Sequence, residues 1–149
     1  MQNETVANAL NRLIRINNDR ILGYGHAAND IDDDSLRTIF ANILAESLEF
    51  VNELEYYVSY YGGQPATDGS LAGEIHQSWL DFKATITGKN LNAVLGSCEF
   101  GDKAAINIYQ TVLGIPEVAD NTELSTLLEM QKTRIEKSLA TIEAIDRDI

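Results

Sequence analysis

Residues 90–113, with the sequence NLNAVLGSCEFGDKAAINIYQTVL, carry the clearest helical pattern in the chain. Apolar side chains recur there every three or four residues, which is typical of a helix with one face in a core. Asp102 lies on this apolar stripe, and Glu99 lies one turn earlier at its edge. A carboxylate in an apolar interior needs a cation, a metal or a proton. The main functional question is therefore what satisfies this pair.

Similar periodicity predicts further helices on both sides of this one. Residues 3–30 and 35–61 precede it, residues 122–148 follow it, and a shorter helix spans residues 71–87. Gly62 and Gly63 form a C-terminal stop for the second helix, and Ser70 caps the shorter one. With only two prolines, the 149-residue chain is expected to be an all-α single domain over residues 1–149.

One polar interruption falls near the midpoint of each long helix. The midpoints of antiparallel helices of similar length lie at one level of a four-helix bundle. We therefore expect the interruptions to meet as a polar layer in the middle of the core. The polar residues of this layer are Asn17, Ser47, Glu99, Asp102, Gln131 and Arg134.

Two chemistries would satisfy such a layer. In the first, carboxylates bind iron or another divalent metal through oxygen. The candidate metal ligands are Glu46, Glu53, Glu99 and Asp102. In the second, Arg134, Asn17, Ser47 and Gln131 donate hydrogen bonds to the carboxylates and no cofactor is bound. The sequence favours the second, because the cation is already present in the chain.

Four tyrosines crowd the end of the second helix. Tyr57 and Tyr61 belong to its core stripe, whereas Tyr56 and Tyr60 share another face at i, i+4 spacing. The group is interpreted either as an aromatic plug at one end of the bundle or as a contact surface for a second copy. The sequence leaves both interpretations open.

His76, Trp79 and Lys83 share a face of the shorter predicted helix, which makes them a candidate surface site. A histidine packed beside the tryptophan is favoured over a metal ligand, because no second histidine or cysteine lies at ligand spacing. Cys98 lies on a core stripe, where burial makes a thiol inert. No nucleophile motif accompanies either histidine, so a hydrolase is not expected.

The charge of the chain restricts its partners. With 11 basic and 23 acidic residues, the formal net charge is −12. Such a chain repels phosphate backbones and anionic membrane surfaces, so neither nucleic acid nor membrane is an expected partner. The single cysteine excludes an internal disulfide. Since neither a signal-peptide pattern nor a membrane-length apolar run is visible, we expect a cytoplasmic protein.

Several short motifs occur along nearly the whole chain in an order that resembles a bacterial ferritin-like four-helix-bundle family of unknown function. They are Ile16-Asn17-Asn18-Asp19, Gly23-Tyr24, Glu53-Leu54, Gly62-Gly63, Ser70-Leu71-Ala72-Gly73, His76, Trp79, Asp81, Lys83, Cys98-Glu99, Gly101-Asp102, Leu127-Leu128 and Gln131. The resemblance implies a ferritin-like antiparallel four-helix bundle. It also implies that the shorter helix belongs to the connection between the two helical pairs.

The resemblance brings no activity, because the family has none assigned. Ferritin-like di-iron proteins use Glu-x-x-His motifs on two helices, and this chain lacks them. We therefore expect an uncharacterised, non-catalytic bundle that self-associates as a homodimer or larger homo-oligomer. The alternative is a ferritin-like protein that binds or oxidises iron through carboxylates.

Overall fold

The computed structural model describes residues 2–70 and 91–148, and every regular element in these ranges is an α-helix. The long helices are α1 (Gln2–Asp30), α2 (Asp34–Tyr60), α4 (Leu91–Leu113) and α6 (Thr122–Asp148). The all-α prediction is confirmed for these residues, and the predicted helix bounds are met within one residue. The helix predicted at residues 71–87 lies outside the described residues.

A short helix, α5 (Pro116–Ala119), fills the turn between α4 and α6 and was not predicted. Pro116 suits its first turn, because the fixed φ of proline is helical and its missing N–H has no helical partner there. Val118 is completely buried, so this turn closes one end of the core.

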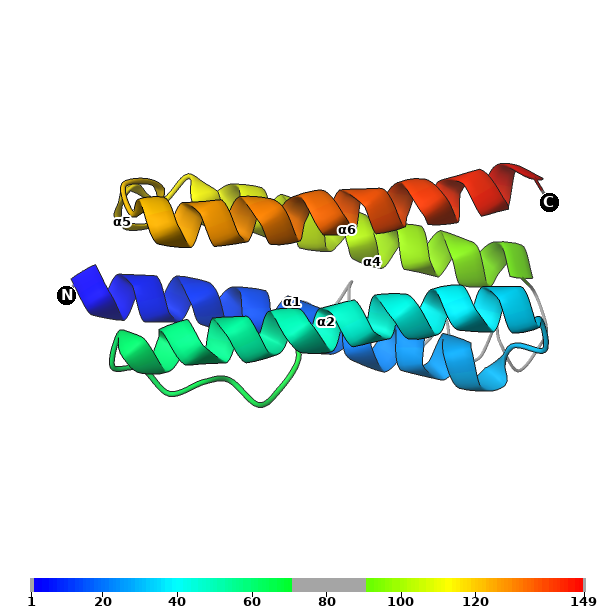
Figure 1. Ribbon diagram of the computed structural model, residues 1–149, viewed down its shortest axis with the longest axis horizontal. Helices are drawn as coiled ribbons and strands as arrows, with labels where there is room; N and C mark the ends of the chain where they lie inside the picture. Colours follow the sequence, from blue (N-terminus) through cyan, green and yellow to red (C-terminus); the bar gives the residue numbers. More distant parts are fainter. Residues whose placement is uncertain (1, 71–90, 149) are drawn as a thin grey trace.

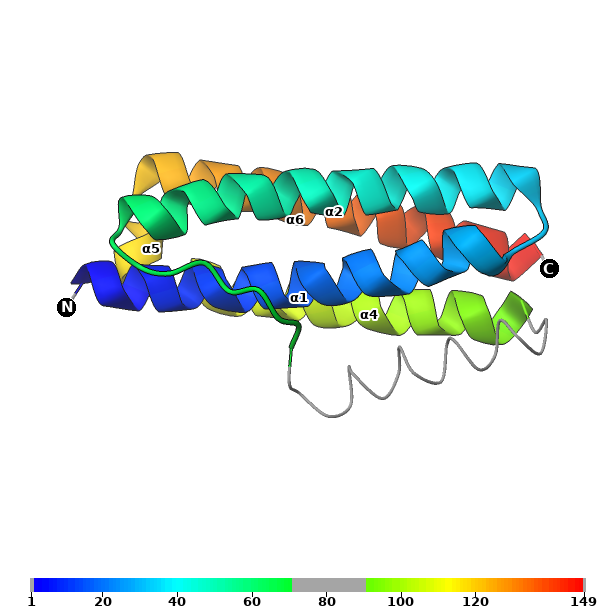
Figure 2. The ribbon, with the colours of Figure 1, turned by 90° about the horizontal axis from the view of Figure 1, so that it is seen from below.

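The long helices form two antiparallel hairpins, α1 with α2 and α4 with α6, which meet through α1 and α4 (Figure 1). Viewed from below, α2 and α6 lie on one side of the molecule and α1 and α4 on the other (Figure 2). Because α1 packs against both α2 and α4, it buries a wider arc of its surface than a helix with one neighbour would. Because of this position, the polar side chains of α1 can contact both α2 and α4 in the candidate site described below.

The boundaries of α2 follow from local chemistry. Asp33 is its N-cap, and the Asp33 carboxylate accepts a hydrogen bond from the backbone N–H of Leu36 at 3.0 Å. After the helix, Gly62 adopts a φ of +80°, a left-handed conformation that favours glycine. A Cβ atom on Gly63 would lie 2.7 Å from the Ala7 side chain, so the close approach of this turn to α1 also requires glycine.

Residues 64–70 run back along α1 and are held by its polar side chains. Asn11 donates to the carbonyl of Gln64 at 3.0 Å and accepts from the N–H of Ala66 at 2.8 Å. Asp19, which is almost completely buried, accepts from the N–H of Ser70 at 3.1 Å. Side chains of α1 therefore form hydrogen bonds with backbone groups of this extended segment, which has no helix or sheet partners of its own.

Candidate functional site

The most unusual feature of the core is an ion pair without solvent exposure. Asp102 on α4 and Arg20 on α1 are both completely buried. The Arg20 Nε donates to Asp102 Oδ1 at 3.0 Å, and the Tyr24 hydroxyl donates to Asp102 Oδ2 at 2.9 Å. The Arg20 Nη1 donates to the Ser47 hydroxyl of α2 at 3.1 Å. Both carboxylate oxygens thus have donors, and the pair connects three helices.

Burial governs the protonation of this cluster. Burial raises the pKa of Asp102, and the charge of Arg20 opposes this rise. Burial lowers the pKa of Arg20, but the charge of Asp102 and the neighbouring groups outweigh burial, so its pKa is raised and the guanidinium remains charged. Burial also raises the pKa of the adjacent Cys98 thiol well above its ordinary value, which leaves the thiol unreactive.

A second chain of hydrogen bonds crosses all four long helices. Asn17 on α1 donates to the Tyr109 hydroxyl on α4 at 2.9 Å. Tyr109 donates to Gln131 Oε1 on α6 at 2.6 Å, and Gln131 Nε2 donates to Glu53 on α2 at 3.0 Å. The polar residues predicted at the midpoints of α1 and α6 therefore meet, but through a tyrosine on α4 and not through Glu99.

We expect Tyr109→Phe to lower the free energy of unfolding by about 1–3 kcal/mol, because it deprives buried Asn17 and Gln131 of their shared partner. Urea unfolding at neutral pH measures the loss. Tyr57→Phe is the matched control, since it removes a hydrogen bond to the exposed Glu123 and should cost less. Equal losses in the two variants would contradict a structural role for the Tyr109 hydrogen bonds.

Arg134 was expected inside the polar layer, but the structure places it at the edge. Its side chain is 36% exposed and pairs with Glu46 at 3.3 Å and with Glu49 at 3.6 Å. The Ser138 hydroxyl also donates to Glu46, at 3.4 Å. The cation that neutralises Asp102 is therefore Arg20, not Arg134, and Arg134 instead connects α6 to α2.

Glu99 also lies apart from the Asp102 cluster. Burial raises its pKa, and the nearby carboxylates of Asp146 and Glu143 on α6 raise it further, against the charge of Lys103. Across residues 2–70 and 91–148, no three His, Cys, Asp or Glu side chains come together in a way that would hold a metal ion. The four predicted metal ligands Glu46, Glu53, Glu99 and Asp102 are accordingly not gathered at one point.

The raised pKa of Glu99 gives a prediction with a definite sign. In the folded state Glu99 binds its proton more tightly than in the unfolded chain. Its contribution to stability therefore falls as the pH rises from the ordinary pKa of glutamate to the raised pKa of the folded state. Glu99→Gln should therefore stabilise the protein near pH 7, by about 0.3–0.5 kcal/mol as expected for a surface charge pair, with no gain near pH 4. Urea melts at both pH values check this.

Glu129→Gln is the control for that experiment, because Glu129 faces the cation of Lys132 at 4.0 Å. This variant should bring no stabilisation near pH 7. A Glu99→Gln gain that persists at acid pH would show that the substitution acts through packing and not through carboxylate repulsion.

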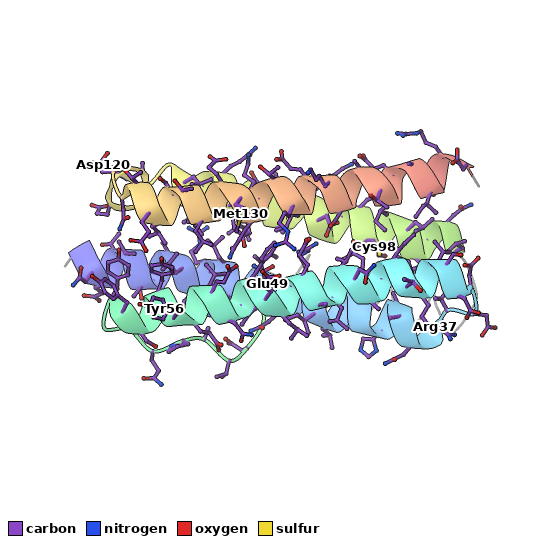
Figure 3. All side chains as sticks on the ribbon, in the orientation of Figure 1. Arg37, Glu49, Tyr56, Cys98, Asp120 and Met130 are labelled. Atoms are coloured by element: carbon purple, nitrogen blue, oxygen red, sulfur yellow. The ribbon has the colours of Figure 1, made fainter. Side chains whose placement is uncertain are left out.

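The four tyrosines divide into two pairs. Tyr57 donates to Glu123 at 2.6 Å and Tyr61 accepts from Asn121, so both connect α2 to the start of α6. Tyr56 and Tyr60 are 65% and 69% exposed. Figure 3 shows Tyr56 on α2 and Met130 on α6, the two helices that pass in front of α1 and α4. The other predicted surface residues, His76, Trp79 and Lys83, lie outside the described residues.

Two buried side-chain atoms, Asn17 Oδ1 and Arg20 Nη2, have no hydrogen-bond partner among the described residues. One is an acceptor and the other a donor, and their residues are one turn apart on α1. The middle of the core thus retains one unused acceptor and one unused donor.

Comparison with known proteins identifies the family of this chain. Residues 5–114 fit the family model described as Domain of unknown function (DUF2383). The chain belongs to this family. The DUF2383 match covers α1, α2 and α4, and so contains Arg20, Ser47, Asp102 and Tyr109, whereas α6 lies beyond it. Neither curated proteins nor solved structures gave a match.

Within this DUF2383 chain, sequence reasoning missed the role of Arg20. The available signal was its spacing, because Asn17, Arg20 and Tyr24 follow one another at i+3 and i+4 on α1. The hydrogen bonds of Tyr24 and Tyr109 were not predicted either. Among the described residues, no helix is both long and apolar enough to cross a membrane.

Proposed function

We propose that this chain is a non-catalytic, ferritin-like helical bundle that self-associates, and that its polar network is structural. The observation that carries the proposal is that three of the four candidate metal ligands pair with protein groups, while Glu99 lies apart beside the carboxylates of α6. Asp102 accepts from Arg20 and Tyr24, Glu53 accepts from Gln131, and Glu46 pairs with Arg134. These donors take the carboxylate oxygens that a metal ion would require.

The connectivity supports the ferritin-like part of the proposal. In ferritin-like folds one long crossover joins two antiparallel helical pairs. Here α1–α2 and α4–α6 are antiparallel pairs, and residues 61–90 connect them. The end of α2 and the start of α4 lie at opposite ends of the molecule, as they do where a long crossover joins two helical pairs (Figure 1).

Metal analysis tests the non-catalytic part. Protein purified without chelator and exposed to ferrous iron in air should contain no stoichiometric metal by plasma mass spectrometry. A content of about two irons per chain, lost in Glu46→Gln with Glu53→Gln, would instead support the carboxylate iron site. Glu49→Gln is the matched control, since Glu49 is exposed and pairs with Arg134, the same arginine that pairs with Glu46.

Sedimentation tests the self-association. The exposed rings of Tyr56 and Tyr60 are large apolar surfaces of the kind that bind partners. Sedimentation velocity at high micromolar concentration should show a dimer or larger oligomer. A single monomeric species at that concentration would remove self-association from the proposal.

A further inference from the structure

The exposed positions of α2 between residues 41 and 60 carry a single charged side chain, and the half-buried Glu46, Glu53 and Glu55 lie at the edges of this face. The core residues of α2, such as Phe40, Ser47 and Leu54, define the opposite side of the helix at 100° per residue. The exposed residues, here called the outer stripe of α2, are Ala41, Asn42, Ala45, Leu48, Glu49, Asn52, Tyr56, Ser59 and Tyr60. Glu49 is the one charged residue of the stripe, and it pairs with Arg134.

The low charge of the outer stripe favours a second copy of the chain as its binding partner. A formal net charge of −12 means that most surfaces of two copies repel each other. The exposed side of α6, for example, carries Glu129 and Glu136. The outer stripe of α2 allows two copies to approach with little like-charge repulsion, and its exposed Leu48, Tyr56 and Tyr60 supply apolar area to bury.

The order of side-chain sizes along the stripe indicates the relative direction of the two helices. Small residues lie at its start and tyrosines at its end. In an antiparallel pair centred between residues 50 and 51, Tyr60 of one copy lies opposite Ala41 of the other. Tyr56 then lies opposite Ala45, and Glu49 opposite Asn52. Each large ring thus meets a small side chain, which lets the helices approach to about 8–10 Å.

A parallel pair would fit poorly. Tyr56 would face Tyr56, Ala45 would face Ala45 with a gap between them, and Glu49 would face Glu49 as a like charge. In the antiparallel arrangement the two Glu49 side chains still lie about 4.5 Å apart along the helix axis, but Arg134 of the same chain offsets each charge at 3.6 Å. The antiparallel arrangement avoids the facing rings and the gap. It is also a two-fold arrangement, in which both copies use the same surface and the assembly closes as a dimer.

The tyrosines of the stripe are held in place before association. The ring of Tyr56 packs edge-on against Tyr57 with centroids 5.1 Å apart, and Tyr60 packs in the same way against Tyr61 at 5.0 Å. Tyr57 and Tyr61 in turn form hydrogen bonds with Glu123 and Asn121, respectively. Because the rings have neighbours already, association loses less side-chain entropy than it would with free rings.

We infer that two copies of this chain bind through their α2 helices in an antiparallel, two-fold dimer that seats Tyr56 and Tyr60 on Ala45 and Ala41 of the second copy. This inference rests on the proposed self-association and specifies its geometry.

Cysteine cross-linking tests the geometry. Ala45→Cys and Tyr56→Cys are made as separate variants, mixed after partial dissociation and treated with a short bismaleimide. The mixture should give a covalent dimer, whereas each variant alone should not, because like positions are about 16 Å apart along the helix axis. The unmodified chain is the control, since its Cys98 is completely buried.

The outcomes separate the geometry from self-association. A sedimenting dimer in which each single variant cross-links and the mixture gives no mixed product would overturn the antiparallel geometry and favour a parallel pair. A sedimenting dimer without any cross-link would place the interface elsewhere and also overturn the geometry. Both results leave the proposed self-association intact, whereas a monomer in sedimentation overturns both.

Discussion

Arg20→Met is expected to lower the free energy of unfolding by about 3–5 kcal/mol, because it leaves the buried carboxylate of Asp102 without its cation. Methionine has similar length and leaves little empty space, so the effect reports mainly on charge. After the substitution, Tyr24 is the remaining donor to Asp102 that the structure shows. Urea unfolding at neutral pH, followed by circular dichroism, measures the change.

The controls for Arg20→Met distinguish charge from packing. Arg134→Met removes a half-exposed ion pair and should cost only about 0–1 kcal/mol. The double variant Arg20→Met with Asp102→Leu should recover most of the loss, because it removes both charges from the core. If Arg20→Met lowered the free energy of unfolding no more than Arg134→Met does, water would have to solvate Asp102. The Arg20–Asp102 ion pair would then not be needed to neutralise the buried carboxylate.

The pH dependence of the Arg20→Met effect has a predicted direction. Burial already raises the pKa of Asp102 in the folded protein, and loss of the guanidinium raises it further. An acid with a raised folded-state pKa loses stability as pH rises through that pKa. The difference between the variant and the unmodified chain should therefore shrink toward acid pH, where Asp102 is neutral, and grow toward neutral pH.

The helices and the unusual position of Asp102 were predictable from sequence, but the identity of its cation was not. A helical pattern through Asn17 and Tyr24 fits either Arg20 or Ile21 as the inward residue, and hydrophobicity favours Ile21. The structure buries Arg20 completely and Ile21 only in part. The reason is tertiary, because α1 packs against both α2 and α4 and its buried arc extends to the arginine.

The same limit explains the positions of Glu99 and Arg134. Glu99 and Asp102 are three residues apart on α4, yet Asp102 meets α1 and Glu99 meets the acidic end of α6. Helical spacing gives the level of a residue along the bundle and the face it occupies. Which neighbouring helix covers that face depends on packing, so Arg134 shares the level of the polar network but contacts Glu46 at its edge.

Charging the outer stripe of α2 is expected to have the largest effect on association. Tyr56→Glu with Tyr60→Glu replaces the two exposed rings with carboxylates, four in a two-fold dimer, on a chain whose net charge is already −12. Tyrosines that become buried in an interface can each contribute about 2 kcal/mol or more. We therefore expect the dimer Kd from sedimentation to rise by at least about 100-fold.

The double variant must remain folded for this result to be informative, and the structure indicates that it will. Tyr56 and Tyr60 are 65% and 69% exposed, and surface substitutions usually change stability by no more than about 0.5 kcal/mol. Leu22→Glu on α1 is the matched control, because Leu22 is an exposed apolar residue outside the stripe. If both variants kept the dimer, association would not depend on the tyrosines, and the α2 surface would be excluded as the interface. If both lost it, the loss would follow from added negative charge in general, and the tyrosines would not be specific contacts.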